Sequence, residues 1–245
     1  MRQWGHRPII NIGSVDTVRT VSDTKREFYT HHTRPINSIY RRVIEELMVE
    51  MHLLSVNTLF KYDAIFALGV VTSYDRFMAG YEPERDLDSI FQALCRAVGR
   101  DPGQYRHDAE QIRNACQNLT VEQLQEWGNA LASEDQAQLL YDSLKASAFN
   151  PTFKYSRLFG IGLYSILEII HGEALGIDDL PPLTMIGESL HLPAEKLRKD
   201  LELYRSNLEK MAQAREVLDD VLQAERKKRQ QRSLEKNTSP DGATH

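Results

Sequence analysis

The chain of 245 residues has few of the features that mark secreted, redox or β-rich proteins. Its two cysteines, Cys95 and Cys116, have neither zinc-ligand spacing nor the number that a disulfide framework requires. We therefore expect two reduced, packed thiols. With 13 glycines and 9 prolines the sequence is poor in turn-forming residues, which favours an all-α protein over a β fold with many turns.

The chain also lacks an apolar run long enough to span a membrane, which takes roughly 18 residues or more. Residues 158–170 come nearest, but the run is shorter and is interrupted by Glu168, so we expect a buried helix. Residues 1–14 do not resemble a signal peptide. The formal net charge of -5 disfavours a nucleic-acid-binding protein.

Helical periodicity is clearest in residues 34–57, RPINSIYRRVIEELMVEMHLLSVN. Pro35 suits a first helical turn, and Asn37 and Ser38 are alternative N-cap residues, so the helix should begin near Ile36. At about 100° per residue, the apolar side chains gather on one wide face that must be buried. They are Ile36, Ile39, Tyr40, Val43, Leu47, Met51 and Leu54.

Glu50 falls inside this apolar arc and therefore needs a partner. An ion pair is the simpler interpretation. The alternative is a metal ligand, because two Glu-x-x-His sequences have the spacing that di-iron helix bundles use. The ligands would be Glu46, Glu50, Glu168, His171, Glu188 and His191. Both histidines stand at predicted helix ends, where the helix dipole accounts for them, so we expect no metal and no cofactor.

Two further helix starts can be read from local signals. Ser22, Asp23 and Thr24 are candidate caps for a short helix, with Thr24 and Glu27 at capping-box spacing. Asp63 should cap the next helix, whose AIFALGVV run is apolar nearly all round and belongs at the centre of a bundle.

Gly160 and Gly162 lie in an apolar helical pattern with no preceding strand. They therefore do not form a dinucleotide-binding fingerprint. We expect close helix packing at these positions.

A long C-terminal helix is predicted for residues 193–225. Its heptad seam consists of Leu197, Leu201, Tyr204, Leu208, Met211, Leu218 and Leu222, with Arg215 as a charged interruption. Ala214, Val217 and Val221 widen the apolar stripe, and few flanking charges are matched. This favours packing on the protein's own body or on another protein over a coiled-coil dimer, and self-association stays open.

The chain divides into four predicted segments. Residues 1–19 are a flexible N-terminal extension, residues 20–192 a single bundle-like helical domain, and residues 193–225 the long helix. Residues 226–245 are a basic tail that we expect to be disordered. Its cations are either a solvated helix end or a membrane-surface site, where each contributes about 1 kcal/mol. They are Arg226, Lys227, Lys228, Arg229 and Arg232.

Residues 34–57 and four other stretches resemble the thylakoid-formation protein family, also described as a photosystem II biogenesis factor. The others are TVSDTKREFY at 20–29, KYDAIFALGVVTSYDRFMAGY at 61–81, FNPTFKYSRLFGIGLYSILEI at 149–169 and LRKDLELYRSNLEKMAQA at 197–214. The resemblance extends over roughly residues 20–224. Because no transit peptide is recognisable, it is to the cyanobacterial type.

The resemblance implies a soluble, non-enzymatic accessory protein at the cytoplasmic face of the thylakoid membrane. The implied partners are FtsH-type membrane proteases, photosystem II assembly or repair intermediates, and the membrane surface. Arg34, Arg41, Arg42 and Glu45 are the candidate contact residues, although they also fit ordinary solvated charges. The alternatives are a di-iron-like helical enzyme, and a membrane-shaping or trafficking scaffold that binds lipid and self-associates.

Overall fold

The computed structural model describes residues 19–117, 119–120, 122–123, 138–148, 150, 152–172, 187–188 and 190–238, with side chains up to residue 231. Regular structure in these ranges is helical, with no strand among them. The all-α prediction is therefore confirmed. The predicted N-terminal extension, apart from Arg19, lies outside the described residues, as do residues 239–245 of the predicted tail.

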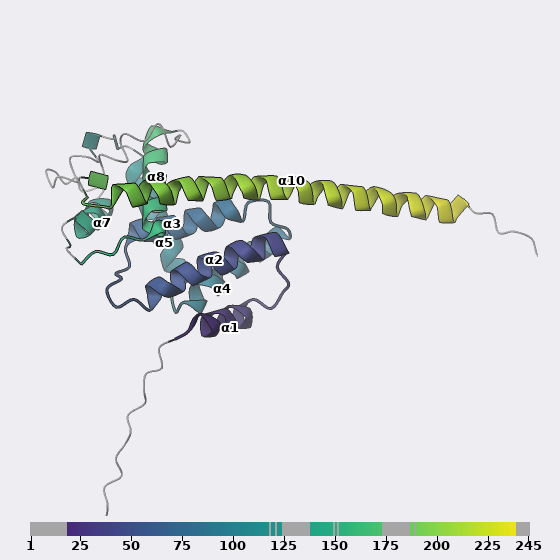
Figure 1. Cartoon of the computed structure of the whole chain (residues 1–245), viewed down its shortest axis with the longest axis horizontal. Coiled ribbons are helices and arrows are strands. Elements are labelled where there is room, and N and C mark those ends of the chain that lie inside the picture. Colours follow the sequence, from purple (N-terminus) through teal and green to yellow (C-terminus); the bar gives the residue numbers. More distant parts are fainter. Residues whose placement is uncertain are drawn as a thin grey trace, which may run out of the picture.

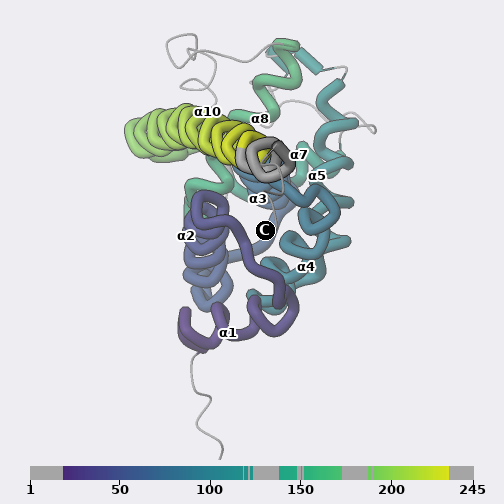
Figure 2. Tube along the Cα trace, turned by 90° about the vertical axis from the view of Figure 1, so that its right-hand side faces the viewer, coloured from purple at the N-terminus to yellow at the C-terminus, as the bar shows by residue number. Residues whose placement is uncertain are grey.

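The elements follow one another as a bundle with one long final helix (Figure 1). They are α1 (Val21–His31), α2 (Ser38–Ser55), α3 (Ala64–Phe77), the 3-10 helix η1 (Glu84–Asp86), α4 (Leu87–Ala97), α5 (Pro102–Cys116), α7 (Gln138–Ala148), α8 (Arg157–His171) and α10 (Ala194–Thr238). Figure 2 looks along α10 and shows α3 beneath it, with α2 on one side and α4 and α5 on the other.

The centre of the fold is the crossing of α3 and α8, the most extensive helix pairing in the described part of the chain. Residues 64–74 of α3 and 158–167 of α8 are all buried. A Cβ atom on Gly162 would lie 2.0 Å from the carbonyl oxygen of Ile65, and one on Gly69 would lie 1.7 Å from that of Leu158. The two backbones therefore touch, as predicted for Gly162.

Several local predictions agree with the structure. Asn37 caps α2, and the Asp63 carboxylate caps α3 by accepting a hydrogen bond of 2.8 Å from the amide of Phe66. Cys95 and Cys116 are free thiols in the core, and burial raises the pKa of each to about 12. Both are therefore neutral packing groups at physiological pH.

The predicted start of α1 is wrong. Its N-cap is Thr20, which forms a capping box with Asp23. Thr24 faces the core instead, where its hydroxyl oxygen lies 2.8 Å from Nδ1 of the buried His52 on α2. The contact with His52 therefore assigns Thr24 to the core, while Thr20 and Asp23 form the cap.

The helix α10 continues to Thr238, beyond the predicted boundary at residue 225. The predicted basic tail is corrected accordingly, because Arg226, Lys227, Lys228, Arg229 and Arg232 belong to this helix. The physical reason is composition. Residues 225–236 are mostly Glu, Lys, Arg, Gln and Leu, which are strong helix formers. No glycine or proline occurs between Pro193 and Pro240.

Only the first part of α10 packs on the body of the protein. Leu197, Leu201, Tyr204 and Met211 are buried, which confirms packing of this part of the seam on the protein's own core. Further along, Val217, Val221 and Leu222 are 64, 50 and 40% exposed. We call residues 216–231 the overhang.

We predict that Gly162→Ala lowers the free energy of unfolding by roughly 1–3 kcal/mol, because the added methyl group meets a backbone carbonyl that cannot rotate away. Chemical denaturation monitored by circular dichroism measures the change.

The matched control is Gly103→Ala, near the start of α5. Its Cβ would be 3.4 Å from the nearest atom, Oδ1 of Asp101, and helix propensity favours alanine. This variant should be neutral or slightly more stable. Equal losses in both variants would contradict the backbone contact as the cause.

Candidate functional site: the groove between α2 and α10

A groove runs between α2 and α10, with α3 and α8 beneath it. One part is a cavity of about 380 Å³ with walls from all four helices. A more open hollow of about 860 Å³ adjoins it. Both are lined by Arg42, Glu46, Glu50 and Arg157, so they form one continuous feature. We call it the α2–α10 groove.

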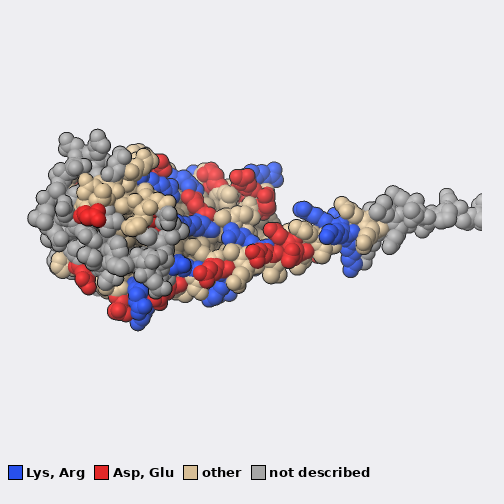
Figure 3. Space-filling view, turned by 90° about the horizontal axis from the view of Figure 1, so that it is seen from above, with Lys and Arg blue, Asp and Glu red and all other residues tan. Residues whose placement is uncertain are grey.

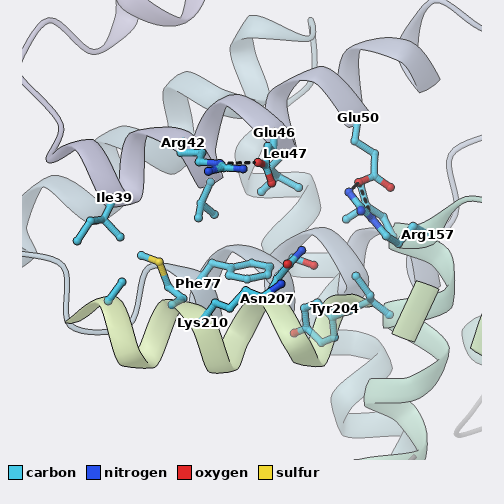
Figure 4. A pocket seen from close by; sticks show the side chains of 16 residues that line it. Ile39, Arg42, Glu46, Leu47, Glu50, Phe77, Arg157, Tyr204, Asn207 and Lys210 are labelled. Atoms are coloured by element: carbon cyan, nitrogen blue, oxygen red, sulfur yellow. Dashed lines mark hydrogen bonds and ion pairs between the residues drawn. The ribbon is translucent and has the colours of Figure 1, made fainter. Parts of the chain in front are cut away.

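The floor of the groove is apolar. Phe77, at the end of α3, lies between the two walls and packs edge-on against Tyr204 of α10, with ring centroids 5.6 Å apart (Figure 4). Val43 of α2 and Met211 of α10 line the same space. Apolar side chains therefore line an opening that solvent can enter.

Glu50 forms an ion pair with Arg157, the first residue of α8. One carboxylate oxygen accepts hydrogen bonds from Nη2 at 2.5 Å and from Nε at 3.1 Å (Figure 4). The Glu50 side chain is only 17% exposed. The ion-pair interpretation is confirmed, and this pair ties α2 to α8.

The residues of the alternative di-iron site do not come together. Glu168 pairs with Arg76 at 2.6 Å near the other end of α8. The helical rise separates Arg157 from Glu168 by about 16 Å, too far for Glu50 and Glu168 to share a metal centre. Glu188 and His191 are exposed. Among the described residues, no group of three or more His, Cys, Asp or Glu could hold a metal ion.

Three of the four predicted contact residues line the groove: Arg41, Arg42 and Glu45. Arg42 pairs with Glu46 at 3.1 Å, and Glu45 pairs with Lys25 at 2.9 Å.

The fourth predicted contact residue, Arg34, lies away from the groove lining. Its guanidinium forms an ion pair of 2.6 Å with the buried carboxylate of Asp86. This contact compensates a buried charge, which is a structural role.

Arg215 of α10 contacts the segment that follows α3. Its guanidinium donates a hydrogen bond to the carbonyl oxygen of Ala79, just beyond α3, and the hydroxyl of Tyr40 donates to the same oxygen at 3.3 Å. The charged interruption of the seam therefore holds α10 against the segment that follows α3. Its acceptor is a backbone atom, so no sequence signal could identify it.

The model of the family described as "Thylakoid formation protein" matches residues 20–233. The match spans the groove, the α3–α8 crossing and most of α10.

The chain belongs to the thylakoid formation protein family.

Its relatives in this family are similar over almost their whole length. Protein Thf1 of Nostoc punctiforme is 56% identical over 230 residues, covering 92% of this chain and 97% of the relative. Protein Thf1 of Rippkaea orientalis is 52% identical over 230 residues, covering 93% and 98%. The solved structure of Psb29 at 1.55 Å has a TM-score of 0.75 and 47% identity, covering 86% of this chain and 98% of that one. The fold described above is therefore the fold of the family.

From the sequence we expected no membrane-spanning helix. Within the described residues, no helix combines the length and the apolar character that crossing a membrane requires. The run at 158–170 belongs to the buried α8, as predicted.

We predict that Arg215→Ala speeds limited proteolysis and amide exchange in residues 212–225, because it removes a hydrogen bond that holds α10 against the body near the start of the overhang. Global stability should change by about 1 kcal/mol or less, since the contact is peripheral. Hydrogen exchange measured by mass spectrometry gives the local effect.

Arg226→Ala is the matched control, since Arg226 lies on the same helix beyond every buried residue of α10. It should leave exchange in residues 212–225 unchanged. Identical exchange in the wild type and in Arg215→Ala would contradict the anchoring role.

Proposed function

We propose that the protein is a non-enzymatic accessory factor for photosystem II biogenesis and repair, which maintains thylakoids by stabilising FtsH-type protease complexes. The observation that carries this proposal is the family match over residues 20–233, which includes nearly all of the described fold. In this proposal the protein acts peripherally, at the cytoplasmic face of the thylakoid membrane.

The groove supports an accessory role more than a catalytic one. Three of its four acidic side chains, Glu45, Glu46 and Glu50, each form an ion pair with a cation. What the groove offers is an apolar floor between two helices, which is a typical surface for binding another protein. In our proposal Arg41, Arg42 and Glu45 contact the protease partner from the rim of this surface.

The overhang suggests how the protein reaches a membrane. Figure 3 shows acidic side chains along its first part and a basic group further out. The basic group contains Arg226, Lys227, Lys228 and Arg229, whose side chains are all exposed. Four consecutive residues point in nearly all directions around a helix, so this group suits a diffuse electrostatic attraction to anionic lipid.

We predict that deleting the gene lowers the abundance of thylakoid FtsH-type complexes and slows recovery of photosystem II after strong light. Immunoblots of the protease subunits and oxygen evolution during recovery measure the two effects. Reintroducing the gene is the control and should restore both. Unchanged protease abundance and recovery in the deletion strain would refute the proposal.

We also predict that replacing Arg226, Lys227, Lys228, Arg229 and Arg232 by Gln releases part of the protein from membranes. Salt should have less effect on the fraction that stays bound, because the Debye length is only about 8 Å at physiological ionic strength. Folding should be intact, since the run lies beyond the last contact with the body. Sedimentation with anionic vesicles at increasing salt measures binding.

The matched control replaces five exposed cations elsewhere by Gln: Lys61, Arg96, Arg100, Lys154 and Lys199. This variant should retain the wild-type salt profile. If the tail variant binds membranes as fully as the wild type, with the same salt dependence, the basic group is a solvated helix end and a protein partner attaches the chain to the membrane.

A further inference from the structure

Three cations that line the α2–α10 groove have no carboxylate partner among the described residues: Arg41, Lys196 and Lys210. Of these, Lys196 lies over the ring of Tyr155, 5.2 Å from its centroid. Arg41 stands on the α2 wall and Lys210 on the α10 wall, and both are exposed. Of the four acidic residues that line the groove, three are held in the ion pairs described above. The fourth, Asp200, lies beside the buried hydroxyl of Tyr155, and burial and this carboxylate raise the pKa of the phenol. The groove therefore presents free positive charge on a chain of net charge -5.

The apolar lining continues past both ends of the cavity. On α2, the exposed Val49 and Leu53 extend the lining of the more open hollow. On α10, the groove-lining residues Asn207, Lys210 and Ala214 recur in steps of three and four, and the exposed apolar Val217 and Val221 continue this series onto the overhang. From residue 200 to residue 221 this wall is about 32 Å long at the rise of an α-helix.

We propose that the groove binds an amphipathic helix of a partner protein, with apolar residues along one face and acidic residues on both flanks. Two helical walls above an apolar floor match the shape of a third helix, and a length of about 32 Å corresponds to roughly 20 residues. Acidic flanks would meet Arg41 on one side and Lys210 on the other. The inference rests on the proposed function, because an accessory factor acts through a bound partner.

A second copy of this chain fits the groove less well, although its overhang is also apolar and acidic. A parallel arrangement would superimpose the two bodies. In an antiparallel arrangement with Val217 opposite Asn207, the basic residues 226–229 would fall opposite residues 195–198. In that stretch Arg198 is paired with Glu195 and Glu202, but Lys196 and the following Lys199 have no ion pair among the described residues. Cations would therefore face these two lysines. A partner helix with acidic flanks avoids this repulsion.

Two designed peptides of about 20 residues test the proposal with the full chain. Both have leucine at helical spacing, one with glutamate flanks and the other with lysine flanks, and fluorescence anisotropy measures binding. The acidic peptide should bind about tenfold or more tightly than the basic one. The double variant Arg41→Glu with Lys210→Glu should reverse this preference, which separates charge recognition from misfolding.

Two further variants locate the site. Leu53→Asp should weaken binding of the acidic peptide about tenfold. It should not unfold the protein, since Leu53 is 57% exposed. Lys61→Glu with Arg100→Glu, which reverses two exposed cations away from the groove, should leave the preference unchanged. Equal binding of both peptides, or a preference that the Arg41 and Lys210 reversal does not alter, would overturn the proposal. If light scattering shows a dimer and dimer formation prevents peptide binding, the proposal is overturned and a second copy occupies the groove.

Experiments with mutant strains distinguish this inference from the proposed function. If gene deletion lowers protease abundance while the Arg41→Glu, Lys210→Glu strain behaves like the wild type, the function stands and the groove assignment fails. If deletion has no effect, the function fails, and the peptide measurements alone decide whether the groove binds an acidic helix.

Discussion

The backbone contact between α3 and α8 is the constraint on which the other features depend. Gly69 and Gly162 let two helices approach until a carbonyl of one touches the backbone of the other, and any side chain there would separate them. Because α8 begins at Arg157 and α3 ends at Phe77, the same crossing fixes both residues at the floor of the groove. The α2–α10 groove is therefore positioned by the core and not by its own loops.

Features that depend on neighbours in sequence could be predicted from the chain alone. The caps Asn37 and Asp63 bond to amides a few residues away. Helical periodicity placed Tyr40, Leu47 and Met51 on the buried face of α2, but Ile44, Met48 and His52 are buried there as well. Glu50 shows the limit of this reasoning. Its burial, and hence its need for a partner, follows from periodicity, whereas its partner Arg157 stands 107 residues further along the chain. Thr24 shows the same limit, since its contact with the distant His52 determined its role.

The groove itself could not be predicted, because it depends on where α10 lies relative to α2. Arg41, Arg42 and Glu45 were expected to be contact residues, and all three line the groove. On α10, a single apolar stripe was expected, but the structure separates it into a buried seam ending near Met211 and an exposed continuation on the overhang. The sequence pattern does not change at that point. What changes is that the body of the protein ends there.

The contact between Arg215 and Ala79 determines how the position of α10 responds to conditions. Arginine keeps its charge at every physiological pH, and a backbone carbonyl does not titrate. An ion pair with a carboxylate would weaken on acidification and be screened more strongly by salt. A charged donor on a neutral acceptor, at the C-terminal end of a helix, is largely insensitive to both. The direction of the overhang should therefore stay constant through changes in acidity and ionic strength that would alter the binding of charged partners.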